Sequence, residues 1–160
     1  MKKLQLILVS LLFISCGIKV TKHKTPEQVN KTIQLTTNKL DNFVKANEWM
    51  VNIFTNPGSI IQFTDKEAGV IKGKYIIHVS TVPSSPYSKE PPTSITHTAI
   101  ITLRVKDKGA KIEIDPIGEF QTTSVMGVTS SYLPSTFIDK AKLLIGDFET
   151  SMKSENKNNW

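Results

Sequence analysis

The stretch that decides the fold is residues 95–115, ITHTAIITLRVKDKGAKIEID. Apolar and polar side chains alternate on both sides of the Asp-Lys-Gly segment at 107–109, and such alternation is typical of strands that bury one face. The short polar segment predicts a tight hairpin turn, with Gly109 in the left-handed conformation. We therefore predict two antiparallel strands, 95–106 and 111–120, with one face packed and the other in water.

The flanking sequence adds three strands and two helices. Alternation and β-branched residues, bounded by turn signals, predict strands over 31–36, 59–64 and 70–80. Apolar residues at helical spacing predict helices over 38–54 and 135–153, with Asn38 and Ser135 as N-caps. The expected order is β-α-β-β-β-β-α, an α+β fold in which an antiparallel sheet carries two helices on one face and leaves the other open. Residues 121–133 are too apolar for a free loop and too short to assign.

The helix over 38–54 carries apolar residues on more than one side. Its expected core stripe is Leu40, Phe43, Val44, Met50, Val51 and Phe54. Ala46, Trp49 and Ile53 lie on the other side, where either the second helix covers them or they form an exposed partner site.

The open face of the sheet is the candidate partner-binding surface. Alternation places on it Lys74, His78, Thr96, Thr98, Thr102, Arg104, Lys106, Glu113 and Asp115, with Ile76 and Ile100 between them. Its Thr and Lys content suits a polar partner such as an envelope protein or a glycan. The alternatives are an ordinary solvated sheet face and a rival site in the proline-rich loop over 81–94, around Tyr87.

Catalytic chemistry is not expected. Alternation puts His97 on the packed face and His78 on the open face, so the two histidines do not predict a metal site. Glu113 and Asp115 are two residues apart on the open face, where a solvated charge pattern competes with a carboxylate pair. The sequence has no zinc spacing, phosphate loop or nucleophile elbow, and we expect no metal and no cofactor. An envelope enzyme with hydrolase-like activity on the open face, and a purely structural protein, remain the alternatives.

The first sixteen residues predict an export signal that ends at the only cysteine of the chain. Lys2 and Lys3 precede an apolar run over 4–14, and Ser15 stands directly before Cys16. This arrangement resembles the signal of bacterial lipoproteins. A run of eleven residues is about 16 Å long as a helix, too short for a bilayer core of about 30 Å. By the resemblance, a signal peptide over 1–15 is removed, and acyl chains such as palmitate on Cys16 hold the protein on the membrane.

The mature chain is expected to have three parts. Residues 16–30 are the lipidated cysteine and a polar tether, 31–153 the folded domain, and 154–160 a polar tail that ends in Trp160. The basic residues of the tether either lie against anionic headgroups or stay solvated. With one cysteine the chain has no internal disulfide, so the core alone must hold the domain.

The chain also resembles domain-of-unknown-function family 4468, which has a fold like that of the TATA-box-binding protein (TBP). The resemblance rests on residues 46–49 (ANEW), 60–74 (IIQFTDKEAGVIKGK) and 103–111 (LRVKDKGAK). The family is found largely in Bacteroidetes proteins, many with lipoprotein signals, and the resemblance implies a TBP-like fold but no activity.

The compartment and the charge pattern argue against nucleic acid as a partner. Export separates the chain from DNA, and the open face lacks an arginine-rich footprint and paired Phe wedges, since Arg104 is the only arginine. The residues after Cys16, Gly17-Ile18-Lys19, lack the acidic run that resembles the surface-export signal of Bacteroidetes lipoproteins. We therefore expect a location in the cell envelope, on the outer membrane and facing the periplasm.

Overall fold

The structure is a computed structural model, and it describes residues 19–56, 58–82, 91–125 and 128–154. The expected signal peptide over 1–15, Cys16, Tyr87 and most of the tail that ends in Trp160 lie outside the described residues.

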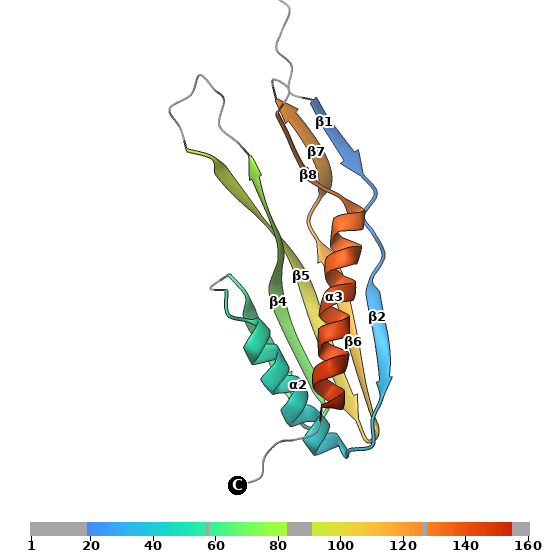
Figure 1. Cartoon of the computed structure of the whole chain (residues 1–160). Coiled ribbons are helices and arrows are strands. Elements are labelled where there is room, and N and C mark those ends of the chain that lie inside the picture. Colours follow the sequence, from blue (N-terminus) through green and yellow to red (C-terminus); the bar gives the residue numbers. More distant parts are fainter. Residues whose placement is uncertain (1–18, 57, 83–90, 126–127, 155–160) are drawn as a thin grey trace, which may run out of the picture.

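Five strands form the main antiparallel sheet, in the order β2-β6-β5-β4-β3. They are β2 (Val29–Gln34), β3 (Ile60–Asp65), β4 (Val70–Val82), β5 (Thr93–Lys106) and β6 (Gly109–Ile117). Helices α2 (Lys39–Ile53) and α3 (Pro134–Lys153) lie side by side on one face of this sheet (Figure 1). The expected α+β fold, with an antiparallel sheet and two helices on one face, is confirmed.

A second sheet of three strands stands beside one end of the first. It consists of β1 (Lys19–His23), β7 (Phe120–Val125) and β8 (Val128–Tyr132), in the order β1-β7-β8. The apolar segment that the sequence left unassigned is therefore the β7–β8 hairpin. The structure also differs from the expected tether, because all five residues of β1 pair with β7. Four of these residues are exposed, so backbone pairing with β7, and not burial, forms this strand. Alternation of apolar and polar residues reports only burial, and therefore could not reveal it.

The core lies between the main sheet and the two helices. Ala99, Ile101 and Leu103 of β5 are fully buried, as are Phe137 and Phe148 of α3. The β5–β6 strands therefore bury the face that alternation assigned to the core.

Helix α2 buries a different stripe from the one expected. Phe43 and Met50 are buried as expected, but Leu40, Val44 and Val51 are 46–54% exposed. Trp49 is buried instead, with its ring 4.8 Å from that of Phe148 in α3. The second helix therefore covers the Trp49 side, and because α2 must contact both the sheet and α3, its buried arc is turned away from Leu40.

The local signals at the ends of elements are confirmed in one case and wrong in two. The Asn38 side chain accepts a hydrogen bond from the backbone N–H of Asp41 at 2.9 Å, as an N-cap does. The N-cap of α3 is Leu133 and not Ser135, because Pro134 takes the first helical position. In the β5–β6 turn Lys108, with φ 57°, takes the left-handed conformation expected of Gly109. Gly109 already pairs with Lys106 in the ladder, so the turn has two residues.

Candidate functional site

The open face of the main sheet brings together most of the residues expected there. Cross-strand register aligns Lys72, Thr102 and Glu113 in one row, and Lys74, Ile100 and Asp115 in the next. Thr96, Thr98, Arg104 and Lys106 alternate along β5 on the same face. Thr102 is only 6% exposed, so it lies beneath its neighbours and offers a partner little surface.

His78 does not belong to the open face. The β4–β5 register pairs Ile76 with Thr98 and His78 with His97, so β4 carries one extra residue at this point. Such a β-bulge shifts the alternation of all residues that follow it. His78 and His97 therefore lie on the same, packed face, with ring centroids 5.7 Å apart. The expectation that they point to opposite faces was wrong for this reason.

Glu113 is held by two cations on the open face. Lys111 Nζ donates to its Oε1 at 2.6 Å, and Arg104 Nε donates to its Oε2 at 3.1 Å. These hydrogen bonds, that of Lys111 first, lower the pKa of Glu113. Asp115 instead accepts a hydrogen bond from Gln28 Nε2 at 2.8 Å. The two carboxylates thus accept hydrogen bonds from different partners, Glu113 from Lys111 and Arg104 and Asp115 from Gln28.

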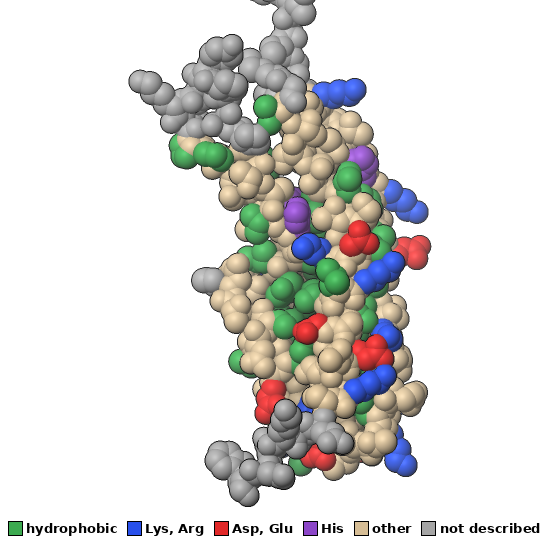
Figure 2. Space-filling view, viewed as in Figure 1, with side chains coloured by type: hydrophobic (Ala, Val, Ile, Leu, Met, Phe, Trp, Pro, Cys, Tyr) green, Lys and Arg blue, Asp and Glu red, His purple; other side chains and the backbone are tan. Residues whose placement is uncertain are grey.

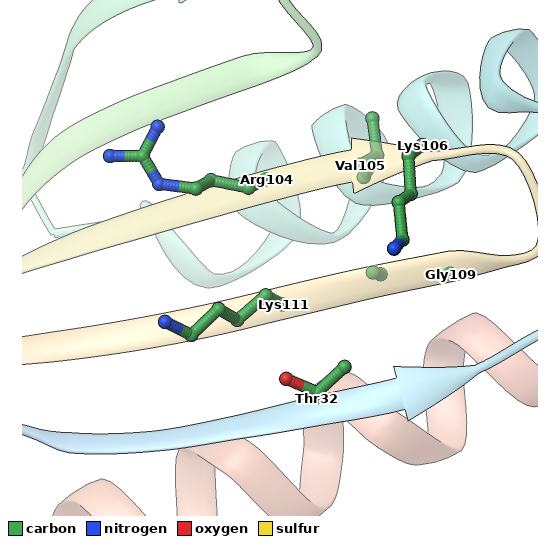
Figure 3. Close-up of a pocket in the computed structure, with 7 residues that line it drawn as sticks. Thr32, Arg104, Val105, Lys106, Gly109 and Lys111 are labelled. Carbon is green, nitrogen blue, oxygen red and sulfur yellow. The ribbon is translucent and has the colours of Figure 1, made fainter.

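A shallow depression of about 250 Å³ lies on the open face above the end of the β5–β6 hairpin. Its lining includes Thr32, Arg104, Lys106, Gly109 and Lys111. Figure 3 shows Lys106 reaching across toward β6, while Arg104 and Lys111 extend along the sheet away from Gly109. The depression therefore offers ammonium, guanidinium and hydroxyl donors, which suit acidic groups.

The open face also carries apolar side chains that the sequence reasoning missed. Ile60 and Phe63 of β3 are 54% and 51% exposed. The register pairs Ile60 with Lys74 and Phe63 with Lys72, so both apolar side chains stand beside lysines on this face. A second irregularity, between Ile61 and Phe63, puts them on the same side. The only sign of this surface in the sequence is Phe63 itself, an apolar residue between the polar Gln62 and Thr64.

A stack of aromatic rings closes the packed face near the second sheet. The Tyr132 ring lies 3.9 Å from that of His97 and 4.5 Å from that of Phe120. Ser80 Oγ and His97 Nε2 are 2.9 Å apart, a hydrogen-bond distance. Burial is the main cause that lowers the pKa of both His78 and His97, and it raises the pKa of Tyr132 to about 12. Ser80 is buried and the His97 ring is covered by Tyr132, so we assign this pair a structural role.

A hollow of about 280 Å³ lies on the opposite side of the molecule, against α3. Its lining residues are Tyr75, Ile77, Lys140, Leu143, Leu144 and Asp147. Figure 2 shows hydrophobic side chains gathered there between the two helices, with basic and acidic side chains around them. Asp147 Oδ2 accepts a hydrogen bond from Trp49 Nε1 at 2.7 Å. No pattern within one segment predicts this hollow, because β4 and α3 are far apart in sequence.

In the described part of the chain, no three or more potential metal-ligating side chains come together. None of its helices is long and apolar enough to cross a membrane.

Two solved structures share the fold. A DUF4468 family protein from Bacteroides ovatus ATCC 8483 has a TM-score of 0.54 at 15% identity, over 87% of this chain and 93% of its own. A TBP-like protein from Parabacteroides distasonis ATCC 8503 has a TM-score of 0.50 at 12% identity, over 78% of this chain and 91% of its own. At these identities the likeness shows the fold alone. None of the curated proteins compared matches the chain.

The family comparison covers more than half of the sequence. The model of the domain of unknown function with TBP-like fold, DUF4468, matches residues 30–119. These residues contain α2 and the whole five-stranded sheet except Val29, the first residue of β2. The chain belongs to the DUF4468 family.

Proposed function

We propose that the protein is a lipid-anchored binding module of the cell envelope. Acyl chains on Cys16 hold it on the outer membrane, facing the periplasm, and the open face of its sheet binds another envelope protein. The module is non-catalytic, and neither nucleic acid nor a cofactor takes part.

The lipid anchor is supported by the sequence before the fold. Lys2 and Lys3, the apolar run over 4–14 and the small Ser15 before Cys16 have the order of a lipoprotein signal. One acyl chain binds a membrane only marginally, whereas two or more hold a protein stably.

The binding role rests on one observation, the exposure of Ile60 and Phe63 among the lysines of the open face. Both side chains are more than half exposed, and no described helix lies on this side of the sheet (Figure 1). Apolar side chains surrounded by charged ones are typical of protein interfaces, where an aromatic anchor is buried and the charges form the rim. This mixture favours a protein over a glycan as the partner.

The anchor is tested by lipid labelling of the full-length protein in its own cells. We expect a labelled fatty acid to be incorporated and the protein to stay with membranes through an alkaline wash. Cys16→Ser should abolish both. Membrane attachment that survives Cys16→Ser would overturn the lipid anchor.

The open face is tested by photo-crosslinking in cells from positions 63, 98 and 104. Position 44 on α2 is the matched control, because Val44 is also about half exposed, at 46%, but lies on the helix side. We expect one envelope protein to be captured from the three open-face positions and not from position 44. Glycan adducts alone would replace the protein partner with a glycan, and equal capture from all four positions would remove the open face as the site.

A further inference from the structure

The position of β1 relative to Cys16 has a consequence for how the domain stands on the membrane. β1 begins at Lys19, three residues after Cys16. Three peptide units span at most about 11 Å between Cα atoms. If acyl chains on Cys16 are in the bilayer, the first residue of β1 cannot lie far above the headgroups.

The pairing of β1 prevents this link from being lengthened without cost. Lys19 pairs with Ser124 and His23 with Phe120, at the two ends of a continuous ladder. The ladder is tied at its inner end, where His23 Nε2 lies 3.0 Å from Thr122 Oγ1 and Phe120 is 1% exposed. Peeling β1 away would break backbone hydrogen bonds on β7.

We propose that the three-stranded sheet β1-β7-β8 is the end of the domain that lies on the membrane, with an anionic lipid surface as its partner. The inference rests on the lipid anchor proposed above. Lys19 meets Ser124 at the outer end of this sheet, next to the β7–β8 turn. Figure 1 shows this end at one extremity of the molecule, with the N-terminal end of α2 and the C-terminal end of α3 at the other.

The charge of this sheet suits an anionic surface. The sequences of β1, β7 and β8 contain Lys19, Lys22 and His23 but no Asp or Glu. Lys22 pairs with Glu119 at 2.9 Å, but both side chains are more than 60% exposed, so the pair is weak and open to competition. Each lysine near an anionic leaflet gains about 1 kcal/mol, so the two together favour contact roughly 30-fold.

This orientation holds the open face away from the bilayer. β5 has 14 residues, so it spans about 45 Å from its membrane-side end at Thr93 to Lys106. The depression lined by Arg104, Lys106 and Lys111 would then face the periplasm and not the headgroups. A partner could reach it without displacing lipid.

Nitroxide labels at the two ends of the lipidated, full-length protein test the orientation. Cys16 is blocked by lipid, so Val20→Cys supplies the only thiol at the β1 end, where Val20 is 48% exposed. Lys66→Cys, in the exposed turn between β3 and β4, supplies one at the far end. The proteins are placed in vesicles of phosphatidylethanolamine and phosphatidylglycerol that carry a nickel-chelating lipid, and nickel at the surface broadens the spectra of nearby labels. We expect broadening at position 20 and none at position 66.

A flexible insertion separates the short link from the lysines as the cause of contact. About twelve Gly/Ser residues between Gly17 and Ile18 add a span of about 20 Å. We expect position 20 to stay broadened in these anionic vesicles and to lose the broadening when Lys19→Gln and Lys22→Gln are added. Lys66→Gln with Lys108→Gln, in the exposed turns at the far end, is the matched control and should leave the broadening at position 20 unchanged.

The outcomes separate this inference from the lipid anchor. Mass spectrometry of the Cys16 peptide is read first, and a peptide without lipid overturns both proposals. A lipidated protein whose label at position 20 is as sharp as that at position 66 overturns the orientation alone. Persistent broadening after both lysine substitutions in the extended protein overturns the role of the lysines.

Discussion

Replacing Gly73 by alanine tests how closely β4 packs beneath the end of α2. A Cβ atom at Gly73 would lie 2.6 Å from Cε1 and 2.7 Å from Cζ of Phe54, and 2.9 Å from the carbonyl oxygen of Ile60. Carbon atoms do not approach so closely, so either the Phe54 ring moves or β3 and β4 separate. Overpacking destabilises a fold by about 1–3 kcal/mol, whereas replacing the flexible glycine backbone by that of alanine stabilises it by about 0.5–1 kcal/mol. We expect Gly73→Ala to lower the free energy of unfolding by about 1.5 kcal/mol.

A second substitution identifies which contact causes the loss. Phe54→Leu removes the two ring atoms that a Cβ at Gly73 would meet, and leaves the Ile60 carbonyl in place. Because Phe54 is only half-buried, this change alone should cost about 1 kcal/mol. In the double variant the ring clash is gone, so the total loss should be smaller than the sum of the single losses by about 1 kcal/mol.

Urea unfolding followed by far-UV circular dichroism gives all three free energies. The slope of the free energy against urea concentration should be the same in each variant, since none of them changes the surface exposed on unfolding by much. Losses that add to within about 0.5 kcal/mol would show that Phe54 does not confine Gly73. A Gly73→Ala variant as stable as the wild type would refute the close approach itself.

Three further predictions concern the packed face. Trp49→Phe removes the N–H that donates to Asp147 and should cost about 1 kcal/mol in urea unfolding, with little added loss from a subsequent Asp147→Ala. Burial is the main cause that lowers the pKa of His78 and of His97 below 6.5. A nearby positive charge adds to it, that of Lys140 for His78 and that of His78 for His97. The stability from their neutral rings is therefore full above pH 6.5 and is lost as the pH falls through the lowered values, so His97→Gln should flatten the acid decline of Tm. Burial raises the pKa of Tyr132 to about 12 from 10.0, so its contribution is full below pH 10 and is lost as the pH rises toward 12. Tyr132→Phe, which removes a buried hydroxyl without a hydrogen-bond partner among the described residues, should keep Tm at neutral pH and flatten its alkaline decline.

The elements that could be predicted are those whose signal lies within one segment. The β5–β6 hairpin follows from alternation on both sides of a turn, and α2 and α3 follow from apolar spacing and, for α2, from the Asn38 cap. The stripe that α2 buries could not be predicted in the same way. Leu40 and Trp49 are both apolar, and only the position of α3 decides that Trp49 is covered and Leu40 exposed.

β1 could not be predicted because burial does not form it. Its sequence, KVTKH, is mostly polar and exposed. It is a strand because it pairs with β7, which lies almost 100 residues later in the chain, as the pair His23 and Phe120 shows. Composition alone therefore indicated a tether. The difference matters for function, because a paired strand beginning at Lys19 sets the distance between the fold and Cys16, whereas a tether would leave it free.

The face on which each candidate residue lies was predicted correctly for β5 and β6 and wrongly for the far end of β4, and a β-bulge explains the difference. β5 and β6 have continuous ladders, so Arg104, Lys111 and Glu113 share the face that alternation gave them. At the bulge, the five residues 76–80 of β4 lie opposite the four residues 95–98 of β5. The extra residue can be recognised only once the partner strand is known. After the bulge Val79, at 46% exposed, takes the open-face position expected of His78, while Ser80 turns inward to His97. The open face therefore carries Val79 of β4 in place of His78, and β3 adds the exposed Ile60 and Phe63. The predicted polar surface becomes a mixed one, and this change is what favours a protein partner over a glycan.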